Sequence, residues 1–230
     1  MKVFVVNAYA YRRSKYDENY ELYPALWWED ITEQQTEQFS FRYNCRLPLR
    51  KKITACTLSH MNLIQKIIDE DLKDVVIVED DCIINNFELL NEIKHLLPEN
   101  EFVYLGGQIN SPLVKDYNTF TKDHKEGIIS HITNDNNLIQ TIEIEKFRVT
   151  HACCYYIPNK QVATQILSSI KEQYGNRKMR AIDVMFWELQ KKKIIKYFLF
   201  PALGTLFLED AKQGYTYSAG YKLTDDQIHY

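Results

Sequence analysis

The sequence predicts an α/β fold in which a mostly parallel central sheet is flanked by helices. The first observation is the run Val75-Val76-Ile77-Val78, four consecutive apolar β-formers typical of an interior strand that is buried on both faces. The second observation is that apolar residues at helical spacing occur on both sides of this run, over residues 53–72 and 87–97. Helices and strands therefore alternate along the chain, as expected for a parallel sheet.

The composition is that of a globular protein. The 230 residues are enough for one large domain or two small ones, and 45% apolar residues supply a full core. The chain shows no internal repeat, low-complexity tract or linker, so we expect a single domain spanning residues 1–230. A formal net charge of −3 without a long basic block argues against nucleic acid as the main partner.

Hydropathy and cysteine usage indicate the cellular compartment in which the protein is expected. No apolar run approaches the roughly 20 residues that a membrane span needs, and the apolar start of the chain is too short for a signal-peptide core. The five cysteines are odd in number and lack a Cys-x-x-Cys spacing. They lie within or beside apolar segments, as reduced core thiols do. We therefore expect no transmembrane segment and a soluble, cytoplasmic protein.

Three carboxylates follow the apolar run without a break: Glu79, Asp80 and Asp81. The carboxyl end of a strand faces the ligand crevice in open α/β sheets. Crowded carboxylates resist burial unless a cation compensates them, and all-oxygen ligands select Mg²⁺ or Mn²⁺. If the segment is extended, Glu79 and Asp81 point to one side and Asp80 to the other. Acids at a strand end also occur as solvated loop residues or helix caps, so this pattern alone leaves both interpretations open.

The chain begins with an apolar strand over residues 2–6 that ends at Asn7 and leads into a polar loop carrying Arg13. Many α/β proteins form a nucleotide site where a first strand meets a basic loop, although arginines after a strand are also common without a ligand. A second strand is expected over residues 20–26. The helix over residues 53–72 then leads directly into the acidic strand.

After the acids, Pro98 should end the helix over residues 87–97. A strand over residues 102–105 should follow and turn at Gly106-Gly107. The polar stretch 108–137 exceeds ordinary connections and predicts either a functional loop, of the kind that often covers a substrate, or an excursion of short hairpins. An exposed strand is expected over residues 141–148 and a buried strand over residues 150–157. Two helices are expected over residues 162–170 and 182–189, and two late strands over residues 194–200 and 203–208.

Several catalytic motifs are absent. With only seven glycines, the chain has neither a Gly-x-Gly-x-x-Gly loop nor a P-loop to bind phosphate, so a diphosphate would need a metal. A Gly-x-Ser-x-Gly elbow is also missing, which leaves a hydrolase triad unsupported. The combination suits an enzyme that handles a nucleoside diphosphate through a divalent ion.

An ordered set of motifs resembles glycosyltransferase family 25, which includes lipooligosaccharide and collagen hydroxylysine galactosyltransferases. The motifs are Ala55-Cys56-Thr57-Leu58-Ser59-His60, Val76-Ile77-Val78-Glu79-Asp80-Asp81, Tyr104-Leu105-Gly106-Gly107, Thr150-His151-Ala152, Ile182-Asp183 and Pro201. The resemblance implies a GT-A fold with a Rossmann-like sheet and a nucleotide-sugar donor, most often a UDP-sugar. It also implies Mn²⁺ or Mg²⁺ at an Asp-x-Asp-like motif, and transfer with inversion to a hydroxyl of a glycan or glycoprotein acceptor.

The resemblance also implies roles for the residues around the acids. Asp81 would bind the metal directly, supported by Glu79, and Asp80 would reach the donor ribose. Asn7 and Arg13 would lie near the nucleotide.

Four further residues are candidates on the same ground. Ser59 and His60 would belong to a helix that packs beside the donor. Asp183 is the candidate base, because it should lie in a first helical turn that can direct a carboxylate into the crevice, although such an Asp is often only a cap. His151, in Thr-His-Ala, is the rival candidate for this role.

Alternative functions remain on the sequence alone. One alternative is a nucleotidyltransferase or phosphohydrolase that uses the same acids, and the other is a catalytically silent sugar-binding or structural domain. A phosphohydrolase that forms an aspartyl phosphate needs a nucleophilic Asp after its first strand, where this chain has Asn7. A silent domain has no need for the full acid triplet.

Overall fold

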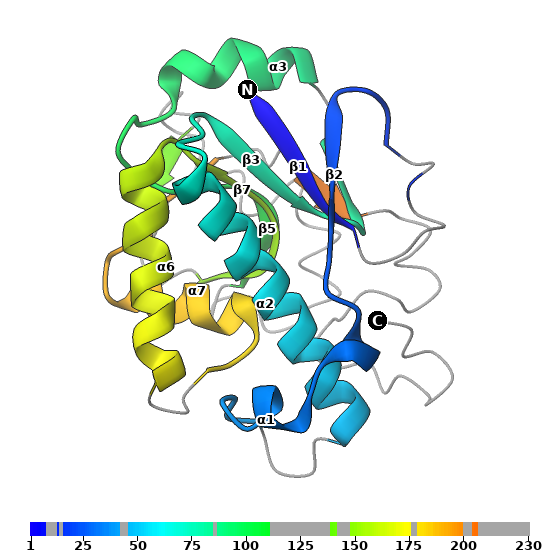
Figure 1. Cartoon of the computed structure of the whole chain (residues 1–230). Helices are drawn as coiled ribbons and strands as arrows, with labels where there is room; N and C mark the ends of the chain where they lie inside the picture. The colour runs from blue at the N-terminus through cyan, green and yellow to red at the C-terminus, as the bar shows by residue number, and fades with distance from the viewer. Residues whose placement is uncertain are drawn as a thin grey trace.

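The computed structural model describes residues 1–7, 13, 16–41, 46–84, 87–110, 139–141, 148–175, 179–199 and 204–206 (Figure 1). The elements are β1 (Lys2–Asn7), β2 (Tyr20–Pro24), η2 (Trp28–Asp30), α1 (Glu33–Thr36), α2 (Leu47–Asp69), β3 (Val75–Glu79), β4 (Cys82–Ile84), α3 (Phe87–Glu92), η3 (Ile93–Leu96), β5 (Val103–Asn110), β6 (Ile139–Thr141), β7 (Arg148–Ile157), α6 (Lys160–Gly175), α7 (Ile182–Lys191), β8 (Tyr197–Leu199) and β9 (Gly204–Leu206).

The strands form one sheet in the order β2-β1-β3-β7-β5-β8-β6, with β9 paired to β4 and β5. Strands β1, β2, β3, β5, β8 and β9 run in one direction, and β4, β6 and β7 run in the other. The predicted mostly parallel sheet is therefore confirmed. β3 is an interior strand, as its apolar run predicts, but one of its neighbours, β7, is antiparallel to it.

Alternate strand residues supply two separate cores, one on each face of the sheet. On one face, Phe4, Ile77 and Tyr155 belong to the core that includes residues of α2, α6 and α7. On the other face, Val5 and Val78 belong to the core that includes residues of α3 and η3. Figure 1 shows α2 and α6 side by side on the first face. The helices thus flank the sheet on both sides, which explains why β3 has no solvent-facing side.

Helix α2 supplies much of the first core and leads into β3. It begins at Leu47, before residue 53 where its apolar pattern starts, and Pro48 lies in its first turn. Proline is favoured there because its fixed φ is helical and its missing N–H would have no helical partner. The basic run Arg50-Lys51-Lys52 has no apolar spacing, so periodicity alone places the helix start too late.

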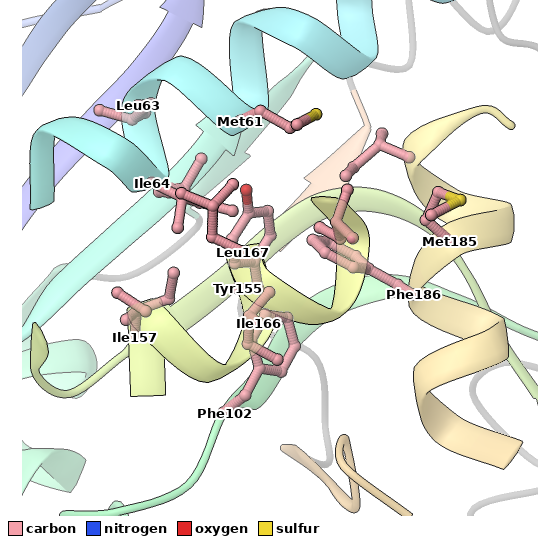
Figure 2. Packing of buried hydrophobic residues seen from close by; sticks show 14 of the residues in the cluster. Met61, Leu63, Ile64, Phe102, Tyr155, Ile157, Ile166, Leu167, Met185 and Phe186 are labelled. Carbon is pink, nitrogen blue, oxygen red and sulfur yellow. The ribbon is translucent and has the colours of Figure 1, made fainter. Parts of the chain in front are cut away.

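Buried aromatic rings fill the space between the sheet and α7. Phe186 of α7 makes edge contacts with Phe102 and Tyr155 at centroid distances of 5.3 and 5.1 Å. Both buried tyrosine hydroxyls have polar partners, since Tyr104 accepts from Gln190 at 3.1 Å and Tyr155 lies 2.7 Å from a ring nitrogen of His60. Figure 2 shows the Tyr155 ring among apolar side chains of α2, α6 and α7.

Two expectations about where strands end were wrong. β5 continues through Gly106-Gly107 to Asn110 instead of turning, and its register against β7 shifts on both sides of Gly106. Glycine within a strand commonly marks such a bulge, which bends the strand without ending it. The segment after Glu79 is a turn rather than an extended chain, so alternation of side chains does not reach Asp81.

The expected strand over residues 141–148 is split. β6 ends at Thr141, Arg148 already belongs to β7, and residues 142–147 lie outside the described part of the chain. Of the expected loop over residues 108–137, residues 108–110 belong to β5 instead, and residues 111–137 also lie outside the described part. Within the described residues, no helix has the length and apolar character needed to cross a bilayer.

The aromatic core yields a stability prediction. Phe186 is fully buried, so Phe186→Ala should lower the free energy of unfolding by about 3–5 kcal/mol through lost packing and a residual cavity. Urea denaturation measures this difference. Leu96→Ala is the matched control, because Leu96 is 48% exposed and its truncation should change stability by about 0.5 kcal/mol or less. Equal losses in the two variants would contradict the packing argument.

Candidate active site

The acids lie where the chain reverses direction between β3 and β4. β3 ends at Glu79, Asp80 and Asp81 form a turn, and β4 begins at Cys82. Asp80 is only 6% exposed and Asp81 only 9% exposed. Buried carboxylates are costly unless charge or hydrogen bonds compensate them, so this turn is unlike an ordinary solvated loop.

Tyr16 fixes this turn from the second face of the sheet. Its hydroxyl donates to the carbonyl oxygen of Cys82 at 2.8 Å, and the carbonyl oxygen of Glu79 lies at 3.3 Å. The turn is therefore held at both ends by one side chain. Burial raises the pKa of Tyr16 far above its ordinary value, and the charges of Asp80 and Asp81 raise it further, so the hydroxyl keeps its proton.

Tyr20 extends this support to β4. Its hydroxyl accepts the backbone N–H of Ile84 at 3.1 Å, and its ring meets that of Tyr16 edge-on at 4.9 Å. Burial raises the pKa of Tyr20 to about 12. The ring of Phe87 contacts Tyr20 on another side at 4.8 Å, which anchors the pair to α3.

Asn7 connects the end of β1 to the acid turn. β1 and β3 are parallel neighbours with Val6 opposite Glu79. Asn7, the last residue of β1, and Asp80, the first residue after β3, therefore lie at the same sheet edge. Arg13 Nε donates to Asn7 Oδ1 at 3.1 Å, and Asn7 Nδ2 donates to Asp80 Oδ2 at 3.4 Å. The structure thus brings together these three predicted residues, with the amide between a cation and a carboxylate.

Glu79 faces helix α2. Its Oε1 lies 3.2 Å from His60 Nε2 and 4.0 Å from Cys56 Sγ. His60 is fully buried, and its Nδ1 lies 2.7 Å from the hydroxyl of Tyr155, with the two rings stacked. Glu79 is therefore turned toward α2, whereas Asp80 is turned toward β1.

Asp183 lies in the first turn of α7 and has an intermediate exposure. The Thr57 hydroxyl of α2 donates to the carbonyl oxygen of Arg180 at 3.3 Å, which holds the start of α7 beside Cys56. Although the Cys56 residue is exposed, the protein atoms packed around its thiol desolvate it and raise its pKa well above the usual range. The charges that raise it further belong to Glu79, Asp183, Asp81 and Asp80.

Ser59 has partners within the protein. Its hydroxyl donates to the carbonyl oxygen of Ala55 at 2.7 Å and accepts the backbone N–H of Leu26 at 2.8 Å. It therefore fastens the segment after β2 to α2, and contact with a ligand stays a prediction.

His151 lies in the first half of β7, upstream of Cys154, which pairs with Val78 near the end of β3. Because β7 is antiparallel to β3, the residues of β7 before Cys154 extend beyond the end of β3. The backbone of His151 therefore lies toward the sheet edge that carries the acids.

Sequence reasoning missed two residues of this site, Tyr16 and Cys56. Cys56 was expected to be a core thiol, but it is exposed, whereas Cys82 and Cys154 are buried as expected. The spacing of Cys56 and His60, four residues apart in a predicted helix, could have placed both on one face. No local pattern points to Tyr16, because its partners lie far along the chain.

This mostly parallel sheet flanked by helices, with acids gathered at the carboxyl edge of its strands, is the GT-A-like architecture of a glycosyltransferase. The chain belongs to glycosyltransferase family 25 (LPS biosynthesis protein), which it matches over residues 6–186. A comparison with curated proteins finds no match. The family match extends from the end of β1 into α7 and so includes every predicted site residue. The predicted family and enzyme class are therefore confirmed.

The turn geometry can be tested with Tyr16→Phe. This change removes the donor to the Cys82 carbonyl and should lower the free energy of unfolding by about 0.5–1.5 kcal/mol, measured by urea denaturation. Tyr23→Phe is the matched control, since the described residues supply no hydrogen bond to the Tyr23 hydroxyl. A change no larger in Tyr16→Phe than in Tyr23→Phe would contradict the proposed support.

Proposed function

We propose that this glycosyltransferase moves a sugar from a UDP-sugar to a hydroxyl of a glycan or protein acceptor, with inversion and with the help of Mn²⁺ or Mg²⁺. The observation that carries the proposal is the buried Asp80-Asp81 turn, joined through Asn7 to Arg13 at the carboxyl edge of β1 and β3. This edge is where open α/β sheets bind ligands.

The residues of the turn fit a hard divalent ion. Asp80 and Asp81 offer carboxylate oxygens, which Mg²⁺ and Mn²⁺ prefer, and their burial disfavours uncompensated negative charge. We assign Asp81 to the metal, supported by Glu79. A bound ion would supply charge neutralisation at the diphosphate leaving group, an effect worth several kcal/mol.

Asn7, Arg13 and Asp80 form the proposed nucleotide side of the site. The Arg13 guanidinium carries a positive charge suited to a phosphate, and its bond to Asn7 orients both side chains. The Asp80 carboxylate can accept a hydrogen bond from a ribose hydroxyl. This arrangement provides donor binding in a chain without a glycine-rich phosphate loop.

Asp183 is our assignment for the base that takes the proton of the acceptor hydroxyl. Its carboxylate lies in the first turn of α7. Its charge helps to raise the pKa of the Cys56 thiol, as do the charges of Glu79 and the two acids of the turn. A carboxylate in this position can accept a proton from a hydroxyl that lies within hydrogen-bond reach. His151 on β7 remains the rival for this role.

Donor hydrolysis tests the proposed cofactor and donor. Wild-type chain should hydrolyse a UDP-sugar from a panel of nucleotide sugars when Mn²⁺ is present, and EDTA should abolish this activity. Asp81→Ala should lower turnover by orders of magnitude, because an effect worth several kcal/mol is lost. Circular dichroism verifies that the variant folds. Full activity in EDTA would overturn the metal assignment, and a preference for another nucleotide would overturn the UDP assignment.

Asp183→Asn tests the base. The amide keeps the shape but cannot accept the proton, so transfer should fall by roughly 10²–10⁴-fold while donor affinity stays near that of wild type. Steady-state kinetics and isothermal titration with UDP measure the two quantities. Near-normal transfer in Asp183→Asn together with an inactive His151→Ala would move the role to His151.

A further inference from the structure

A second group of potential metal ligands lies beside the acid turn. Cys56, His60 and Glu79 each direct one donor atom to a common point, and these three atoms all lie within 4.8 Å of one another. Cys56 and His60 are one helical turn apart on α2, and Glu79 is the last residue of β3. The cluster therefore joins two elements that both belong to the core of the fold.

The donor atoms differ in kind from those of Asp80 and Asp81. A thiolate sulfur, an imidazole nitrogen and one carboxylate oxygen are the ligand set of Zn²⁺ rather than of Mg²⁺ or Mn²⁺. We propose that Cys56, His60 and Glu79 form a Zn²⁺ site that adjoins the hard-ion site of the turn, with Glu79 at the boundary between the two sites. Three protein ligands leave a fourth position for water or another ligand.

The distances suit tetrahedral zinc. Ordinary zinc bond lengths place neighbouring ligand atoms about 3.3–3.6 Å apart. The nitrogen and oxygen of His60 and Glu79 are 3.2 Å apart, and the sulfur of Cys56 is 4.0 Å from the same oxygen. All three donor atoms lie within 4.8 Å of one another, so binding requires the sulfur to move closer to the other two atoms.

Tyr155 supplies the outer contact that a zinc-bound histidine needs. Its hydroxyl lies 2.7 Å from His60 Nδ1, so Nδ1–H can donate to it while Nε2 offers its lone pair to the metal. Figure 2 shows Tyr155 held between apolar side chains, which fixes this partner in place. Binding converts the Cys56 thiol to a thiolate, and the released proton passes to solvent.

The surrounding charge favours a cation at this point. The carboxylates of Asp80, Asp81 and Asp183 all act on the sulfur of Cys56, in addition to that of Glu79. These carboxylates create a negative field that attracts a cation. The same field explains why the site would select a cation over an anionic ligand.

Co²⁺ provides a spectroscopic test, because it occupies zinc sites and shows a thiolate-to-metal charge-transfer band. The full chain titrated with Co²⁺ should develop this band, and added Zn²⁺ should abolish it. Cys56→Ser should lose the band, whereas Cys82→Ala, which removes the thiol next to Asp81, should keep it. Co²⁺ held by Asp80 and Asp81 alone would give no such band, since all its ligands would be oxygens.

Alkylation of the wild-type chain gives a second readout that requires no variant. Zn²⁺ should slow the reaction of Cys56 with iodoacetamide at least tenfold, as mapped by mass spectrometry, and Mg²⁺ should not. A missing band in wild type, a band that survives Cys56→Ser, or equal alkylation with Zn²⁺ and Mg²⁺ would each overturn the proposal. None of these measurements uses donor or turnover, so failure here leaves the proposed function untouched.

Discussion

Two carboxylates buried at the end of an apolar strand require compensation, and much of the surrounding structure supplies it. Tyr16 holds both ends of the Asp80-Asp81 turn through backbone carbonyls, and Asn7 donates to Asp80 from the neighbouring strand. Each contact joins residues that are distant along the chain. The geometry of the acids therefore depends on the completed sheet and not on the turn alone, which suits a site that must stay rigid while substrates exchange.

The other acid of the triplet is supported from the opposite side. Glu79 contacts His60, and His60 contacts Tyr155, so a chain of polar groups runs from the site into the aromatic core. Because His60 and Tyr155 are fully buried, each would be costly without the other. One sheet edge thus carries two differently built regions, with oxygen donors toward β1 and mixed donors toward α2.

Local patterns predicted the parts of the fold that local patterns control. Continuous apolar runs located β1 and β3, which are buried on both faces, and helical spacing located α2, α6 and α7, each of which buries one face. The turn at Asp80-Asp81, the bulge at Gly106 and the antiparallel direction of β7 depend on pairing partners, which spacing does not encode. Spacing does not reveal Tyr16 either, because its role depends on hydrogen bonds to the backbone of Glu79 and Cys82, far along the chain. The end of the first strand and its basic loop pointed to Asn7 and Arg13, and a family motif supplied Asp183; no periodicity singles out these three residues.

The place of β7 in the sheet has a consequence for how the protein forms. β7 lies between β3 and β5, yet it follows both in the sequence. While the chain emerges from the ribosome, the inner edges of β3 and β5 have no neighbour until residues 148–157 have been made. Pairing of strands so distant in sequence is slow, and apolar edges left open in the interval attract other chains. Expression at low temperature, or with chaperones that cover nascent strands, should therefore raise the yield of folded protein more than changes at the protein surface.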